Sequence, residues 1–239
     1  FAGVNRRQAV LQALNLKTGQ TILDIGCGGG HLLELLALAV GKSGAVYGLD
    51  PSEVQLKSAQ VRCNRFENIK FFSNPASEIP LDADSCDSVV AIQTLEYIKN
   101  ISETLVEISR VLKSNSIFVN VSVLWDHFKF YGPEEKLNNE IHEIFRAHCH
   151  HQMLPLELEG KLEKLKFKAV KSQEIPFLIT KRHENSPATF SEVIISTFAL
   201  KAGMSETKVT DWLAQLRKAE EAKRYGFTSF PVLTIAHLN

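Results

Sequence analysis

The stretch Thr21-Ile22-Leu23-Asp24-Ile25-Gly26-Cys27-Gly28-Gly29-Gly30-His31 decides the fold that we expect of this chain. Residues 21–25 have the length and branched side chains of a buried strand, and residues 32–40 are apolar enough to form a helix that packs back on it. Glycines between a strand and a helix tolerate positive φ angles and let a ligand approach the backbone. The N-terminus of that helix then presents unpaired N–H groups to a polar ligand.

The spacing of the glycines separates two classes of cofactor. A dinucleotide-binding fingerprint reads G-x-G-x-x-G, and its third glycine would fall here on His31 or on Leu33. Residues 24–30 instead resemble motif I, D-x-G-C-G-x-G, of the class I S-adenosylmethionine-dependent methyltransferases. The resemblance implies that the acid lies near the amino group of the methionine moiety and that the glycines let the nucleoside cross the strand end. The motif residues assigned to this cofactor site are Asp24, Gly26, Cys27, Gly28 and Gly30.

A second acid follows the next expected strand, Ala45–Leu49. Asp50 stands 20 residues after Gly30, the distance that one helix and one strand need in a βαβ unit. An acid at this strand tip can accept hydrogen bonds from both ribose hydroxyls of a nucleoside. It can also cap a helix over residues 52–61, and both roles can hold together. Pro51 ends the strand and is assigned to the same site.

The third expected strand, Ile69–Phe72, leads into a loop that departs from the family pattern. Relatives often have an acid there that accepts from the adenine amino group, followed by a small residue whose N–H reaches the ring. Here Pro75 stands at the position of the acid and Ala76 follows it. Asn74, Ser77 or a main-chain carbonyl is the candidate replacement for the missing carboxylate.

The fourth expected strand, Asp87–Ile92, is followed by Gln93, our candidate for the contact to the methionine moiety. Residues 86–97 resemble the family stretch FDxVxxxxxLEH, and residues 107–113 resemble E-x-x-R-V-L-K. A helix over 102–112 and a fifth strand, Ile117–Val123, complete the part that carries the resemblance, roughly the first 123 residues.

The segment Trp125–Tyr131 directly follows the fifth strand and is expected to leave the sheet on the cofactor side. It combines apolar side chains with polar groups that can orient or deprotonate a nucleophile. His127 is the candidate general base, and Tyr131 is the second candidate catalytic residue. The alternative is a surface aromatic cluster with an ordinary histidine.

Five further residues resemble metal ligands at first glance. They lack an H-E-x-x-H or paired C-x-x-C arrangement, so we expect no metal site and interpret them as a solvated helix end. These residues are His142, His148, Cys149, His150 and His151.

The second half of the chain is expected to complete the sheet and to cover the pocket. Apolar periodicity predicts lid helices over 134–151, 189–202 and 205–225, with Trp212 in the core of the lid. A helix over 155–165 and a sixth strand over 167–172 come between them. The resemblance implies that the last strand, residues 227–236, runs antiparallel at the sheet edge.

The fold expected from these elements is α/β. It has a Rossmann-like, seven-stranded, mostly parallel sheet with an antiparallel last strand, helices on both faces and helical lid insertions. We expect one continuous domain in which residues 1–124 form the cofactor-binding core. Residues 125–239 then add the remaining strands and the helical substrate lid (125–152 and 176–226). Because Phe1 is not a methionine, we also expect a segment before it.

Composition limits the partners. Lys plus Arg and Asp plus Glu number 27 each, so the chain has no net field to attract a nucleic acid. Its apolar stretches are too short for a membrane span, and its four cysteines are widely spaced, as free thiols of a reducing, cytoplasmic compartment would be. The expected partner is a small-molecule substrate.

The resemblance implies transfer of a methyl group from S-adenosyl-L-methionine to an oxygen, nitrogen or carbon atom of a small molecule. A base is needed if the acceptor is a hydroxyl or an ammonium group, and none is needed for a carbon that is already nucleophilic. Two alternatives remain. One is a partner protein that binds the cofactor without catalysis, and the other is a different nucleoside-dependent transferase on the same fold.

Overall fold

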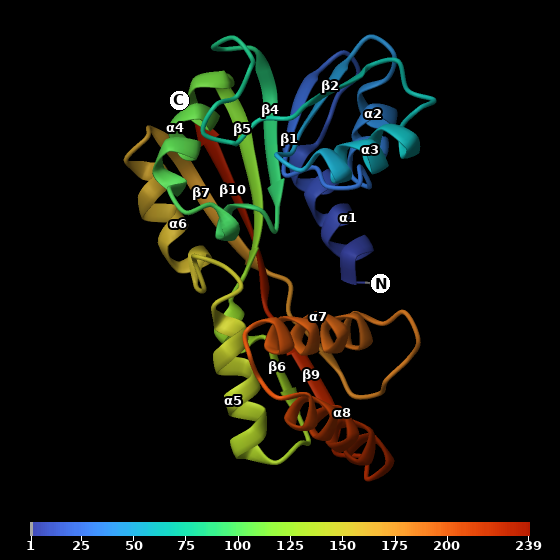
Figure 1. Cartoon of the computed structure of the whole chain (residues 1–239). Coiled ribbons are helices and arrows are strands. Elements are labelled where there is room, and N and C mark those ends of the chain that lie inside the picture. The colour runs from blue at the N-terminus through green and yellow to red at the C-terminus, as the bar shows by residue number, and fades with distance from the viewer. Residues whose placement is uncertain (1) are drawn as a thin grey trace.

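The computed structural model describes the backbone of residues 2–239 and the side chains of residues 6–168 and 170–239. A seven-stranded sheet runs through the upper part of the molecule in Figure 1. In spatial order its strands are β3 (Ile69–Phe72), β2 (Ala45–Leu49), β1 (Thr21–Ile25), β4 (Cys86–Ile92), β5 (Leu112–Val123), β10 (Pro231–Leu238) and β7 (Phe167–Glu174). Phe1 lies outside the described residues.

The sheet confirms the predicted α/β class. β1 pairs in parallel with β2 and β4, β4 pairs in parallel with β5, and β10 runs antiparallel to its neighbours. The expected place of the last strand was wrong, however, because β10 lies between β5 and β7 and β7 forms the edge. The side chains of β10 explain this position. Six of its eight residues are buried, as suits a strand paired on both sides rather than one that exposes a row of N–H groups.

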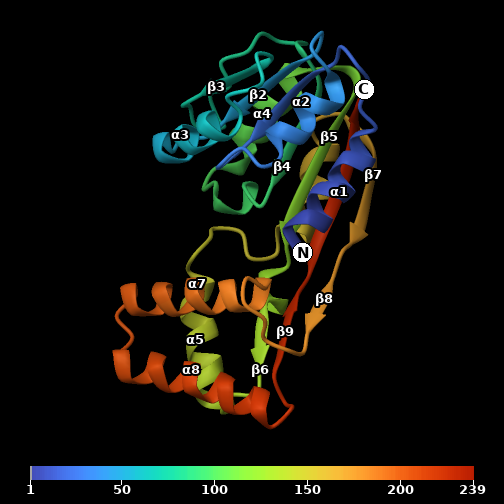
Figure 2. The same ribbon diagram turned by 90° about the vertical axis from the view of Figure 1, so that its right-hand side faces the viewer.

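Helices cover both faces of the sheet, and their apolar stripes form two cores. One core joins β1 and β5 to α4 (Ile101–Val111) and α6 (Leu154–Glu163). The other joins the opposite face to α1 (Ala2–Leu14), α2 (Leu33–Val40) and α3 (Glu53–Arg62). Successive strand residues alternate between the two, since Ile22 enters one core and Leu23 the other. Figure 2 shows α1 against the face formed by β5 and β10.

A second unit, which we call the helical lobe, lies beyond the carboxyl end of β5, at the bottom of Figure 1. The three predicted lid helices are present, although their ends differ by up to five residues. The sequence analysis did not predict the three-stranded sheet between them, whose strands are only three or four residues long. The lobe consists of β6 (Lys129–Tyr131), α5 (Glu135–Arg146), β8 (Phe177–Ile179), α7 (Pro187–Lys201), α8 (Glu206–Glu221) and β9 (Gly226–Ser229).

The predicted strand over 227–236 is therefore two strands. β9 pairs with β6 and β8 in the lobe, and β10 continues into the large sheet. At the junction, the carbonyl of Phe230 accepts a hydrogen bond from the N–H of Leu124 at 3.0 Å. None of the helices in the described part of the chain has the length and hydrophobicity that a membrane crossing needs.

Trp212 lies in the core of the lobe, as predicted, with its side chain fully buried. Its indole N–H donates to Oδ1 of Asn138 at 2.9 Å, and Nδ2 of Asn138 donates to the carbonyl of Phe130 at 2.8 Å. One buried amide therefore connects α8, α5 and β6.

Replacing this amide by an isosteric apolar side chain, Asn138→Leu, leaves the Trp212 N–H and the Phe130 carbonyl without a partner. We expect the free energy of unfolding to fall by about 2–4 kcal/mol, measured by denaturant unfolding. The control is Asn139→Leu, because Asn139 is exposed and its side chain accepts a hydrogen bond only from the Lys129 ammonium among the described residues. It should change stability by less than about 0.5 kcal/mol, and equal effects of the two variants would contradict the role given to Asn138.

Candidate cofactor and acceptor site

The turn between β1 and α2 depends on glycine at three positions. Gly26, Gly28 and Gly30 have φ angles of 69°, 51° and 79°, in the region that other L-residues rarely adopt. A Cβ atom on Gly26 would lie 2.2 Å from Oγ1 of Thr94, and one on Gly30 would lie 3.0 Å from Cα of Ala59. The motif glycines thus permit both the turn itself and the close approach of neighbouring loops.

Asp50 connects this turn to the next one. Its Oδ2 accepts a hydrogen bond from the N–H of Gly28 at 3.0 Å, and its Oδ1 accepts from the N–H of Ser52 at 2.9 Å. The cap of α3 is Ser52, whose hydroxyl accepts from the N–H of Gln55. Ser52 provides the side-chain cap of the helix, and each oxygen of the Asp50 carboxylate at the strand tip can accept one further hydrogen bond.

Asp24 is a buried carboxyl at the same edge. Its side chain is 3% exposed and has no hydrogen-bond partner among the described residues. Burial, and secondarily the neighbouring Asp50 carboxylate, raises the pKa of Asp24 well above its ordinary value. A cationic group beside Asp24 would supply both the missing partner and the compensating charge.

Gln93 projects from the end of β4, with a φ angle of +50° that is unusual for a residue with a side chain. Its N–H donates to the carbonyl of Val121 at 2.7 Å, which fixes this backbone. Its Oε1 accepts a hydrogen bond from the guanidinium of Arg6 on α1. This bond brings the first helix of the chain to the tip of the fourth strand of the sheet.

Arg6 and Gln93 line a cavity of about 540 Å³ between the large sheet and the helical lobe, which we call the inter-lobe cavity. Its polar lining includes Asn185, Ser186 and Ser191, at the start of α7 and just before it. Its aromatic lining consists of Tyr97, Trp125, Phe128, Phe145, Phe177, Phe190 and Phe227.

Glu96 lies close to this cavity, but the residue is fully buried. Its carboxylate accepts hydrogen bonds from the hydroxyl of Ser122 at 3.1 Å and from the N–H of Val123 at 3.4 Å. Burial raises the pKa of Glu96 to about 7, although these two hydrogen bonds and the charge of Arg6 act in the opposite direction. Sequence reasoning missed both Glu96 and Arg6 as members of the site. Glu96 was visible only as part of a family pattern, and Arg6 lies outside every motif.

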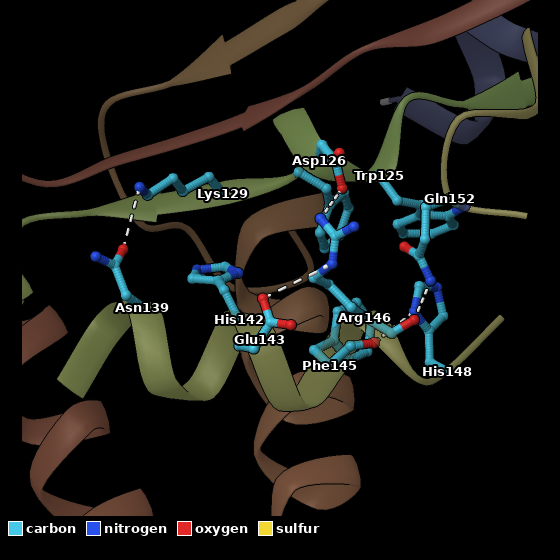
Figure 3. A pocket seen from close by; sticks show the side chains of 11 residues that line it. Trp125, Asp126, Lys129, Asn139, His142, Glu143, Phe145, Arg146, His148 and Gln152 are labelled. Carbon is cyan, nitrogen blue, oxygen red and sulfur yellow. Dashed lines mark hydrogen bonds and ion pairs between the residues drawn. The ribbon is translucent and has the colours of Figure 1, made fainter. Parts of the chain in front are cut away.

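A smaller cavity of about 190 Å³ lies between α5 and the segment before β6 (Figure 3). Arg146 crosses it to bind Asp126 and, at 3.7 Å, Glu143. Nε2 of His142 accepts a hydrogen bond from the N–H of Phe130 at 3.1 Å, and burial lowers the pKa of His142 to about 4. This histidine is therefore a structural acceptor. The described residues contain no cluster of His, Cys, Asp and Glu that could hold a metal ion.

The structure does not bring the two predicted catalytic residues to the inter-lobe cavity. His127 is exposed, and its ring packs 5.3 Å from that of Phe230. Tyr131 is 46% exposed at the far end of β6, opposite Gly226 of β9. A residue that closely follows β5 therefore need not face the cavity, because the chain turns away into the lobe with β6.

The remaining predicted cofactor residues have mixed surroundings. Pro75 is exposed in a turn, where its carbonyl accepts a hydrogen bond from the N–H of Glu78 at 3.0 Å. The next residue, Ala76, is buried in the core. Pro51 is exposed beside Asp50. The Cys27 thiol is buried, and burial raises its pKa, so it packs as a small apolar side chain.

Comparison with known proteins agrees with this geometry. A family model described as "Methyltransferase domain" matches residues 16–187, well over half of the chain. The chain belongs to the class I S-adenosylmethionine-dependent methyltransferases.

The relatives of this methyltransferase domain are distant in sequence. The demethylmenaquinone methyltransferase of Staphylococcus carnosus is 34% identical over 113 residues, which are 47% of this chain and 47% of that enzyme. An uncharacterized 37.1 kDa protein in transposon TN4556 of Streptomyces fradiae is 28% identical over 145 residues, 61% of this chain and 40% of that protein. The matched region thus spans less than half the length of these curated relatives.

Solved structures share the whole fold at lower identity. The YcgJ protein of Bacillus subtilis superposes with a TM-score of 0.68 at 16% identity, covering 98% of this chain and 97% of its own. Phosphoethanolamine N-methyltransferase 2 of Haemonchus contortus, solved with phosphomonomethylethanolamine and S-adenosylhomocysteine, gives a TM-score of 0.62 at 18% identity. That match covers 98% of this chain and 52% of the other.

The residues at the edge of the sheet fit the cofactor of the methyltransferase domain. A Cβ on Gly28 or Gly29 would meet nothing closer than Oε1 of Gln55, at 3.9 and 3.8 Å, so this side of the turn is open. The unpartnered carboxyl of Asp24 suits a ligand ammonium group, and the Asp50 carboxylate suits two ribose hydroxyls. The chemistry of this donor and acceptor set therefore matches S-adenosylmethionine.

The variant Asp50→Ala removes the acceptor from both the Gly28 turn and the cofactor. We expect its affinity for S-adenosylhomocysteine to fall about a hundredfold in isothermal titration, since two hydrogen bonds to a charged group are lost. The control Glu53→Ala, a nearby exposed acid on α3, should bind like the wild-type domain. Unchanged affinity in Asp50→Ala would contradict the assignment.

Glu96 predicts a pH dependence of stability. Because its folded-state pKa of about 7 exceeds its ordinary value of 4.5, the folded state binds the proton more tightly, and stability falls as pH rises from about 4.5 to 7. Glu96→Gln cannot ionise, so above pH 7 it should be more stable than the wild type by up to about 3 kcal/mol and lose this advantage at pH 4.5. Denaturant unfolding at several pH values measures this. The exposed control Glu103→Gln should track the wild type, and a pH-independent difference for Glu96→Gln would refute the assigned pKa.

Proposed function

We propose that this methyltransferase domain transfers the methyl group of S-adenosylmethionine to a small-molecule acceptor bound in the inter-lobe cavity. The observation that carries the proposal is the position of this cavity. Gln93 at the tip of β4 lines it, while Asp24 and Asp50 lie at the ends of β1 and β2 on the same edge of the sheet. Ligands of open α/β sheets bind at this edge, so cofactor and acceptor would meet beside β4.

S-adenosylmethionine, when bound, supplies a methyl group already activated by its sulfonium. The chain has then to hold the acceptor atom about 3–3.5 Å from the methyl carbon, in line with the bond that breaks, and to exclude water. The aromatic lining suits the second task. Phe128 packs edge-on to Phe227 at 4.8 Å and also contacts Trp125, which gives the cavity a closely packed apolar wall.

His148 replaces His127 as the candidate proton acceptor for a hydroxyl or ammonium nucleophile. Its ring lines the cavity, stacked 4.0 Å from Phe145. Nδ1 lies 2.7 Å from the carbonyl of Phe145 and must carry the proton there, so Nε2 is the acceptor of the ring. Nε2 has no partner among the described residues and is closed off from solvent, so the ring has to turn for Nε2 to reach an acceptor in the cavity. Burial lowers the pKa of His148, which favours the neutral ring. An acceptor carbon that is already nucleophilic would not use it.

The test gives the domain S-adenosylmethionine together with one acceptor at a time from a panel of phenols, carboxylic acids, amines and enolisable carbon acids. The S-adenosylhomocysteine that forms is measured by chromatography. We expect turnover that depends on at least one acceptor. Gly26→Ala should abolish it, because the added methyl group collides with Thr94 in a turn that requires a positive φ.

The matched control is Gly160→Ala on α6, where an added Cβ meets nothing within 4 Å. It should keep full activity. Tight binding of S-adenosylhomocysteine with no turnover on any acceptor would favour the catalytically inactive cofactor-binding protein instead.

A further inference from the structure

One hydroxyl in the wall of the inter-lobe cavity is available to a ligand. It belongs to Ser229, the last residue of β9, which lines the cavity although the residue is only 2% exposed. The hydroxyl has no hydrogen-bond partner among the described residues, and its oxygen is not one of the polar atoms that are closed off from solvent. A buried hydroxyl without a partner costs free energy, so a ligand oxygen that hydrogen-bonds to it removes that cost.

The alternation of side chains along β9 directs this hydroxyl into the cavity. Phe227 and Ser229 lie on the same face of the strand, and both line the cavity. Thr228, between them, lies on the other face and donates a hydrogen bond to the carbonyl of His127 at 3.0 Å. Phe177 pairs with Ser229 across the lobe sheet and also lines the cavity. Ser229 is therefore a polar point in a wall of aromatic side chains.

The two other serines of the cavity lining already have partners. The hydroxyl of Ser191 donates to the carbonyl of Pro187 at 2.7 Å. The hydroxyl of Ser186 accepts from the N–H of Thr189 at 3.2 Å and so caps α7. These two hydroxyls serve the helix, whereas the hydroxyl of Ser229 serves no contact within the described part of the chain.

The cavity lining offers little to a charged ligand. Among the described lining residues there is no aspartate or glutamate. The lining arginine, Arg6, already donates to Gln93 and faces the charge of Glu96. A charged group that enters would lose hydration against seven aromatic side chains without gaining a counter-charge. The lining therefore favours an uncharged ligand.

The wall on α7 leaves apolar surface for such a ligand to cover. Phe190 and Ile194, one turn apart, are 67% and 42% exposed although both line the cavity. Removing apolar surface from water is favourable in proportion to the area that is covered. A ligand with an apolar body gains this contribution, whereas a small polar ligand does not.

We propose that Ser229 is a specificity-determining residue of the acceptor site. Its hydroxyl binds a hydroxyl or carbonyl oxygen of an uncharged methyl acceptor, and the apolar body of that acceptor lies against the aromatic wall and Phe190. A serine hydroxyl can both donate and accept, so either kind of oxygen suits it. A site of this kind rejects an analogue that lacks the oxygen, because the buried hydroxyl is then left unpaired. This inference rests on the proposed function and narrows its substrate class.

The test compares 2-naphthol with 2-methylnaphthalene, which has a methyl group in place of the hydroxyl. Binding to the domain saturated with S-adenosylhomocysteine is measured by equilibrium dialysis. We expect 2-naphthol to bind about tenfold more tightly. Ser229→Ala should reduce the affinity for 2-naphthol to that for 2-methylnaphthalene and leave S-adenosylhomocysteine binding unchanged. The matched control is Ser191→Ala, the same change at a lining serine whose hydroxyl is already bonded, and it should keep the preference.

Two charged probes of similar shape, 2-naphthoate and 2-naphthylmethylammonium, test the preference for an uncharged ligand. Both should bind more weakly than 2-naphthol, and tighter binding of either would overturn this part of the inference. Phe190→Ala should weaken 2-naphthol and 2-methylnaphthalene alike. Its control is Leu200→Ala, which is 43% exposed on the same helix but does not line the cavity, and which should weaken neither.

Equal affinity of the wild type for 2-naphthol and 2-methylnaphthalene would overturn the role of Ser229, as would an undiminished preference in Ser229→Ala. Failure of the wild type to bind S-adenosylhomocysteine would contradict the proposed function instead. The ratio of the two affinities, measured without S-adenosylhomocysteine, would then still decide whether Ser229 selects a ligand oxygen.

Discussion

The contact on which the site depends is the pair of hydrogen bonds from the N–H groups of Gly28 and Ser52 to the Asp50 carboxylate. It joins the turn after β1 to the turn after β2, and therefore fixes the two loops that meet at the edge of the sheet. Gly28 can take part only because glycine tolerates its positive φ angle. The same edge holds Asp24, a buried carboxyl that has no hydrogen-bond partner among the described residues. This edge therefore offers an acceptor for hydroxyls at Asp50 and a position for a cation at Asp24.

The position of the inter-lobe cavity depends on two stretches of backbone that connect the large sheet with the lobe. β5 continues through residues 124–128 into β6, and β10 is preceded by β9, so the junction is crossed twice by paired backbone. The lobe is thereby held over the tips of β4 and β5, with α7 on the side that faces the sheet (Figure 2). A cavity between an α/β sheet and an added helical unit is a frequent place for a small-molecule site.

Much of this architecture could be predicted from local sequence. β1 and the glycine turn follow from an apolar run and the φ angles that glycine permits, and the place of Asp50 follows from the length of a βαβ unit. Other features depend on contacts between distant segments. The lobe sheet pairs three strands of three or four residues that are far apart in the chain, too short for a periodic signal. Arg6 contacts Gln93 from 87 residues away in the sequence. The position of His127 after a strand says nothing about the direction in which β6 leaves. The interior place of β10 likewise depends on pairing with β5, which no single segment encodes.

The central claim is that the ends of β1, β2 and β4 hold the cofactor of this methyltransferase domain. A crystal structure of the complex with S-adenosylhomocysteine tests it most directly. The account predicts the ribose hydroxyls within hydrogen-bond distance of the Asp50 carboxylate, the amino group of the ligand beside Asp24, and its sulfur directed toward the inter-lobe cavity. A nucleoside bound elsewhere, for example in the cavity of Figure 3 between α5 and β6, would contradict it.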